Sequence, residues 1–177
     1  MTILLIIVSI AVVLAAVIAS QPSAFRIVRS ATIAVPPETV FPYVNDLRKW
    51  EAWSPWAKMD PDCKMTFEGP AAGTGASYAW SGNSKVGEGN MLITESEPCE
   101  LILIKLAFLK PFKATHTVEF TFKPTGNETL VTWAMSGTNN FLAKTIVLIM
   151  NCDKMIGGQY EKGLADMKAL VESGAKS

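Results

Sequence analysis

The chain has 177 residues, the length of one domain of ordinary size, and its 16 lysine and arginine residues balance 16 aspartate and glutamate residues. This zero net charge excludes a general nucleic-acid binder, which needs a basic surplus, and an acidic disordered chain. The mean hydropathy of +0.25 is high for a soluble domain. The excess comes from the N-terminal segment, and the rest has the hydropathy of an ordinary globular domain.

An apolar segment begins the chain. Residues 3–19 are apolar except for Ser9, and no charged residue comes before Arg26. A helix over residues 2–21 is about 30 Å long, which matches the hydrocarbon core of a bilayer. Because this segment has no lysine or arginine and is longer than the apolar part of an ordinary signal peptide, we predict a membrane anchor.

The chain is therefore divided into a transmembrane anchor over residues 1–21, a linker over 22–25 and one domain over 26–175. The positive charges nearest to the anchor are Arg26 and Arg29, which follow it. The positive-inside bias then places the domain of this single-pass chain in the cytoplasm. Cleavage of the segment and export of the domain is the alternative.

Short β-rich runs fill most of the domain. A strand is expected at residues 25–35, followed by a helix that begins at Pro36-Pro37-Glu38 and that Pro42 keeps short or kinked. Further strands are expected at residues 65–68, 77–80, 87–97, 100–110, 113–123 and 128–136. Glycine and proline turns separate them, and strands at this spacing predict an antiparallel meander.

The last segment has a helical pattern, with one apolar face formed by Tyr160, Leu164, Met167 and Val171. Gly157-Gly158 predicts a break or a close contact just before this face. The economical fold is α+β, with a strongly curved antiparallel seven-stranded sheet wrapped on a long C-terminal helix. The space between the sheet and the helix is the natural binding site.

Several motifs over about residues 26–172 resemble the START/polyketide cyclase-like superfamily, also called SRPBCC, and its polyketide cyclase/dehydrase branch. They are Val35-Pro36-Pro37-Glu38, Trp53-Ser54-Pro55-Trp56, Tyr78-Ala79-Trp80-Ser81-Gly82-Asn83 and Gly157-Gly158-Gln159-Tyr160. The resemblance implies the helix-grip fold and a cavity for hydrophobic ligands. It transfers no catalytic signature, because members of the superfamily include lipid carriers, cyclases and hormone receptors.

His116 is the only histidine of the chain. Strand alternation places it on an apolar face with Ala114, Val118 and Phe120. It is either a base or hydrogen-bond donor in the cavity, and then the candidate catalytic residue, or a structural histidine that is satisfied by a neighbour or lies near the strand end. Apolar surroundings disfavour the charged ring, so we expect a pKa below 6.5.

Aromatic and sulfur-containing side chains gather in the middle of the chain. The tryptophans recur at a spacing of three in one stretch and on strands elsewhere, a pattern typical of both core packing and pocket walls. We predict a ligand-binding wall formed by Trp53, Trp56, Tyr78, Trp80, Met91, Ile93, His116, Phe120, Trp133 and Met135.

Three further features have alternative interpretations. Lys105 interrupts an apolar strand, and its ammonium group either reaches solvent at an edge or enters the cavity as an anion anchor. Residues 141–150 form either a buried helix on the sheet or an amphipathic cover over the cavity mouth that touches lipid. The carboxylates of Asp60 and Asp62 flank a proline and are expected to be solvated.

The cysteines, Cys63, Cys99 and Cys152, are widely spaced and odd in number. They lack the spacing of a zinc or iron–sulfur site, so we predict no metal and no cofactor. We interpret them as buried small hydrophobes, which favours a reducing compartment.

These observations favour a membrane-tethered, non-catalytic domain that binds a hydrophobic small molecule or lipid, with no nucleic-acid partner. One alternative is a polyketide cyclase/dehydratase-type enzyme that uses His116 as acid or base. Another is an interaction domain of the chaperone-cofactor type.

Overall fold

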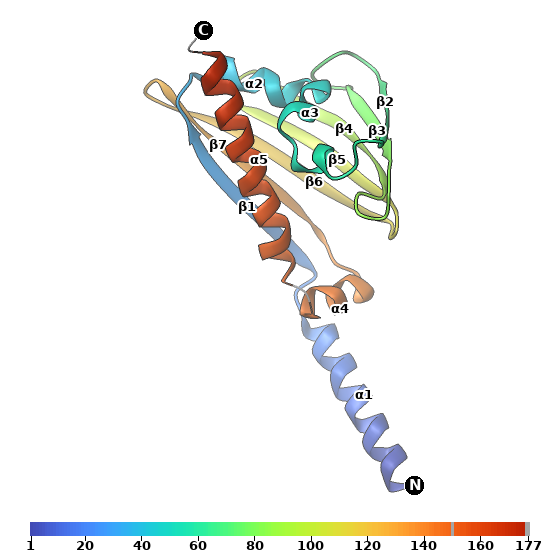
Figure 1. Cartoon of the computed structure of the whole chain (residues 1–177). Coiled ribbons are helices and arrows are strands. Elements are labelled where there is room, and N and C mark those ends of the chain that lie inside the picture. Colours follow the sequence, from blue (N-terminus) through green and yellow to red (C-terminus); the bar gives the residue numbers. More distant parts are fainter. Residues whose placement is uncertain (150, 176–177) are drawn as a thin grey trace.

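The computed structural model describes residues 1–149 and 151–175. Helix α1 (Thr2–Ser20) projects away from the rest of the molecule, and none of its residues is buried (Figure 1). Among the described residues it is the one helix long and apolar enough to cross a membrane, a test that a signal sequence also passes. Its composition is compatible with membrane anchoring.

The domain is built on one curved antiparallel sheet of seven strands (Figure 1). The strands are β1 (Ala24–Ile33), β2 (Lys64–Glu68), β3 (Ser77–Ser81), β4 (Glu88–Glu97), β5 (Leu101–Lys110), β6 (Ala114–Thr125) and β7 (Glu128–Thr138). Their spatial order is β1-β7-β6-β5-β4-β3-β2. Strands β2 to β7 therefore form the predicted meander, and β1 pairs with β7.

The helices cover one face and one end of this sheet. They are α2 (Pro37–Asn45), α3 (Trp50–Trp53), α4 (Phe141–Ile149) and α5 (Cys152–Gly174), with short 3₁₀ turns η1 (Leu47–Lys49) and η2 (Pro55–Lys58). The predicted segment 141–150 includes Met150, which lies outside the described residues. α2 is short, as expected with Pro42 inside it. The predicted α+β fold with a long C-terminal helix is confirmed.

The core lies between the sheet and α5. Strand alternation sends Ile102, Ile104 and Leu106 of β5 inward. At the centre, the Trp133 ring of β7 stacks on the Tyr160 ring of α5, with centroids 3.9 Å apart and planes 9° apart. The long helix is thus held against the sheet by aromatic packing.

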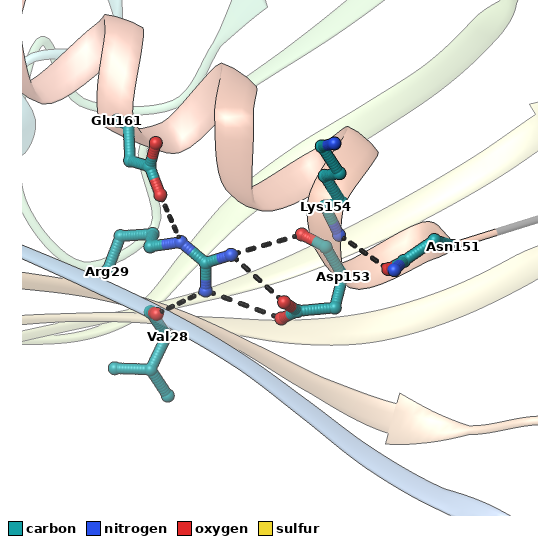
Figure 2. A network of polar contacts seen from close by, with 6 residues as sticks. All are labelled: Val28, Arg29, Asn151, Asp153, Lys154 and Glu161. Atoms are coloured by element: carbon teal, nitrogen blue, oxygen red, sulfur yellow. Dashed lines mark hydrogen bonds and ion pairs between the residues drawn. The ribbon is translucent and has the colours of Figure 1, made fainter.

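An arginine fastens β1 to the first turns of α5 (Figure 2). Arg29 donates from Nε to Glu161 Oε1 at 2.6 Å and from Nη2 to Asp153 Oδ2 at 3.0 Å. α5 passes through Gly157 without a break, and a Cβ at Gly157 would overlap the Arg29 guanidinium. The glycine pair therefore marks a close contact between strand and helix.

Candidate functional site

A cavity of about 750 Å³ lies between the sheet and the helices. Its walls are the inward faces of the strands, the first turns of α5, the turn η2 and the helix α4. The predicted residues that line it are Trp56, Tyr78, Trp80, Met91, His116, Trp133 and Met135. The sheet brings six of them together from strands far apart in the sequence, because alternation points their side chains to one face, and Trp56 joins them from η2.

The other predicted wall residues, Trp53, Ile93 and Phe120, are fully buried and lie behind the cavity surface. Trp53 donates its indole N–H to the Tyr43 carbonyl oxygen at 2.9 Å. Phe120 stacks on Trp133 with ring centroids 4.9 Å apart. These side chains support the wall, and Trp133 is the ring of this cluster that faces the cavity.

The sequence analysis missed part of the wall. Leu106 and Phe108 of β5 line the cavity beside His116, and so do Ala143 and Ile146 of α4. Alternation through residues 100–110 already placed Leu106 and Phe108 on one face, and this signal could have identified them. For α4 the sequence analysis offered a cover over the cavity mouth as one of two interpretations, but it could not name the residues that line the cavity, because the tertiary path of the chain decides which face meets it.

The His116 ring lies in an apolar part of the cavity. Its centroid is 5.2 Å from that of Phe25 and 6.0 Å from that of Phe108, both in edge-to-face contact. Gly137 makes room for it, because a Cβ there would overlap His116 Nδ1. Burial lowers the pKa of His116 below its ordinary value of 6.5, as predicted. The ring is therefore neutral at pH 7.

Two buried polar atoms of this wall have no hydrogen-bond partner among the described residues. They are His116 Nδ1 and the indole Nε1 of Trp133. His116 Nδ1 is thus not satisfied by a neighbour, and His116 lies near the start of β6. An indole N–H can only donate, whereas a neutral imidazole donates from one nitrogen and accepts at the other. Both side chains line the cavity, but the two atoms are buried below its surface, so a bound oxygen pairs with them only by reaching between the wall side chains.

Asp60, Cys63 and Tyr78 lie together at another part of the wall. Asp60 is only 9 % exposed and accepts a hydrogen bond from the Asn83 backbone N–H at 2.6 Å, so the expected solvated loop carboxylate is wrong. Burial, and then the Asp60 charge, raise the pKa of the Cys63 thiol. Burial also raises the pKa of the Tyr78 hydroxyl. Both groups are protonated at pH 7, which disfavours a thiolate nucleophile.

The solvent exposure of the side chains decides the hypotheses on Lys105 and on the cysteines. Lys105 is exposed on the outer face of β5, opposite to the inward Ile104 and Leu106, so the anion anchor inside the cavity is wrong. The cysteines are free and only partly buried, which corrects their interpretation as fully buried hydrophobes. Among the described residues, no group of three or more His, Cys, Asp or Glu side chains is placed to hold a metal ion.

Comparison with known proteins agrees with this architecture. Residues 24–172 match the model of the family described as polyketide cyclase / dehydrase and lipid transport. The chain belongs to this family. The resemblance drawn from the sequence motifs is thereby confirmed. None of the curated proteins compared with the chain matches it.

Several solved structures share the fold of this chain. The SA2116 protein of unknown function from Staphylococcus aureus has a TM-score of 0.65 at 10% identity, covering 89% of this chain and 99% of its own. The MLL2253 protein from Mesorhizobium loti has a TM-score of 0.61 at 16% identity, covering 84% and 98%. The di-domain ARO/CYC StfQ of the steffimycin biosynthetic pathway has a TM-score of 0.65 at 14% identity, covering 88% and 53%.

Proposed function

We propose that the chain holds a hydrophobic small molecule or a lipid in its internal cavity while tethered to a membrane, and that it binds this molecule without converting it. The observation that carries the proposal is the cavity of about 750 Å³ with its aromatic walls. Ligand pockets for small molecules span about 300–1,000 Å³ and are lined mainly by apolar and aromatic side chains.

The unpaired polar atoms indicate the chemistry of the ligand. Trp133 Nε1 requires an acceptor, and the rings around it, including those of Trp56 and Tyr160, offer only their faces and edges. His116 supplies a second neutral hydrogen-bonding group in the same cavity. An apolar body with a carbonyl, ester or hydroxyl oxygen fits this wall best.

The tether is part of the proposal. α1 is apolar along its length and none of its residues packs into a core, although burial of such a surface is strongly favourable. Insertion of residues 1–21 in a bilayer would remove this surface from water. The short link of residues 21–23 and the domain, which begins with β1, then follow at the membrane surface.

Lipid mass spectrometry of the full-length chain, purified natively in mild detergent, tests the binding. We expect an apolar molecule with an oxygen acceptor at nearly one per chain, and binding of a fluorescent fatty acid after its removal. A Val118→Phe variant, which fills the cavity wall, should weaken fatty-acid binding, whereas Val28→Phe on the outer face of β1 should not. A chain that carries no apolar molecule and binds no fatty acid would contradict the proposal.

A second candidate function is an enzyme of the polyketide cyclase/dehydratase type. It is favoured by a neutral histidine that lines the cavity and has an unpaired ring nitrogen, in a family whose description names polyketide cyclase / dehydrase. Loss of a general acid or base costs about 10²–10⁴ in rate. As a ligand contact, His116 should matter much less, up to about tenfold in affinity.

His116→Gln distinguishes the two functions. We expect no turnover of poly-keto and acyl substrates by the wild-type chain, and at most about a tenfold loss of ligand affinity in the variant. A measurable turnover number that falls about a hundredfold in a well-folded variant with intact affinity would establish the enzyme instead.

A further inference from the structure

Helix α4 is apolar on two opposite faces. Phe141, Leu142 and Leu148 are 55%, 54% and 47% exposed. The other face, with Ala143 and Ile146, lines the cavity. A helix that is apolar all round is expected to be buried or to lie against a nonpolar phase. The exposed face of α4 therefore lacks a covering surface among the described residues.

The polar side chains of α4 do not require water on that face. Thr145 Oγ1 donates to the Phe141 carbonyl oxygen at 3.0 Å, inside the helix itself. Lys144 Nζ donates to the Ala19 carbonyl oxygen at 3.3 Å, at the end of α1. α4 is thus joined to α1 directly, and its exposed apolar face carries no unsatisfied hydroxyl group.

The position of α4 fixes its distance from any bilayer that holds α1. It lies between the C-terminal end of α1 and the end of the sheet (Figure 1). Only residues 21–23 separate α1 from β1, and so short a link extends about 3.3–3.6 Å per residue at most. A bilayer spanned by α1 would therefore have its surface at α4.

The same end of the sheet carries a second apolar protrusion beside basic residues. Leu109 at the end of β5 (46%) and Phe112 in the turn between β5 and β6 (58%) are exposed, next to Lys113 and to Lys110, which pairs with Glu88. Because β6 starts where β7 ends, this turn lies at the end of the sheet from which α4 departs. Exposed apolar side chains with neighbouring lysines match the interface of an anionic bilayer.

We propose that α4 is a membrane-seated lid of the cavity. Its face with Phe141, Leu142 and Leu148 lies in the interface of the bilayer that α1 spans, and its opposite face closes the cavity. An apolar ligand then passes between bilayer and cavity at α4 without crossing water. This inference rests on the proposed tether and on the proposed binding function.

Photo-cross-linking of the native full-length chain tests the placement. The chain is reconstituted in vesicles of phosphatidylcholine and phosphatidylglycerol that contain a lipid with a diazirine near the top of its acyl chain. We expect adducts on α1 and on residues 141–148, and none on β1 at the outward Val28. Adducts on α1 without adducts on α4 would overturn the lid alone, and absence of both would overturn the tether with it.

A second copy of the chain is the alternative occupant of the exposed α4 face, and protein density in the membrane tests it. The yield of adducts on α4 should be independent of the number of chains per vesicle, because lipid is always present. Adducts that decline as protein density rises would assign this face to a second copy of the chain and overturn the lid.

Ligand transfer tests the role of the lid. The probe is a fatty acid with an anthracene label, and energy transfer from the cavity tryptophans reports its passage from vesicle to protein. In Leu142→Asp/Leu148→Asp we expect transfer at least about tenfold slower, because acidic groups oppose insertion of the face. Probe affinity in detergent should stay unchanged, because these side chains point away from the cavity.

Val28→Asp is the control, a change of the same kind at a single exposed apolar residue on the outer face of β1. Its transfer rate should equal that of the wild-type chain. Equal transfer rates in the wild-type chain, the α4 variant and the control would overturn the lid. Failure of the wild-type chain to bind the probe in detergent would contradict the binding function, and the transfer role with it.

Discussion

Trp133 and Trp53 are neighbouring buried indoles with different hydrogen bonds. Their ring centroids are 5.4 Å apart. Trp53 Nε1 donates to the Tyr43 carbonyl oxygen, whereas Trp133 Nε1 is buried with no partner among the described residues. A buried polar group without a partner costs about 1–3 kcal/mol, so the Trp133 N–H destabilises the empty domain and favours a ligand oxygen.

Replacement of each indole by phenyl separates the two roles. Trp133→Phe should lower ligand affinity up to about tenfold, because it removes one hydrogen bond to the ligand. Trp53→Phe should mainly lower the free energy of unfolding, because it leaves the Tyr43 carbonyl oxygen unpaired. Fatty-acid titration and urea unfolding of both variants measure these effects. Equal affinity losses in both would contradict a direct contact at Trp133.

His116 makes stability depend on pH in a defined window. Its native pKa is lowered by burial, so below the ordinary pKa of 6.5 the unfolded chain binds more protons than the folded chain. The free energy of unfolding should therefore be fully retained above pH 6.5 and fall as pH drops from there through the lowered native pKa. His116→Gln should remove this part of the pH dependence. Urea unfolding of both proteins between pH 7.5 and pH 5 measures this. The same pH dependence of the free energy of unfolding in both would contradict it.

At the scale of elements, the contact between β1 and α5 depends on a missing side chain. Arg29 reaches Asp153 and Glu161 across the backbone of Gly157 (Figure 2). Next to it, Gly158 has no atom within 4 Å of the position of a Cβ. The two adjacent glycines are therefore a matched pair in one helix turn.

Alanine substitution of each glycine tests this arrangement. Gly158→Ala should raise the free energy of unfolding by about 0.5–1 kcal/mol, because alanine favours the helix. Gly157→Ala should instead lower the free energy of unfolding below that of the wild-type chain, because the Arg29 guanidinium must leave its carboxylate partners. Urea unfolding measures both. A stabilised Gly157→Ala would show that Arg29 does not depend on the close approach.

At the scale of the whole molecule, one apolar helix stands outside a folded domain (Figure 1). If α1 is an anchor, carbonate-washed membranes should retain the full-length chain, because the helix matches the bilayer core in length. A chain that begins at Ser23 should be recovered in the soluble fraction, with some residual affinity for anionic vesicles through α4. A mature protein that lacks residues 1–19 would show instead that the segment is a signal sequence.

The features that could be predicted from the sequence are those that patterns within one strand, turn or helix determine. Alternation placed His116, Trp133 and Met135 on the inward faces of their strands, and turn residues marked where each strand ends. The helical spacing from Tyr160 onward identified the face of α5 that packs on the sheet. These features follow from periods of two and of 3.6 residues, which act within one element.

The tertiary structure decided what depends on elements meeting. Asp60 is buried because the turn at Asn83, distant in sequence, donates to it. Trp53 lies behind the wall and Trp56 on it, because Trp53 ends α3 and Trp56 belongs to the separate turn η2 that follows. The role of α4 depends on its place between the sheet and α1, since its composition alone suits a buried helix equally well. Sequence periodicity gives the direction of a side chain relative to its own element, and only packing shows what that side chain meets.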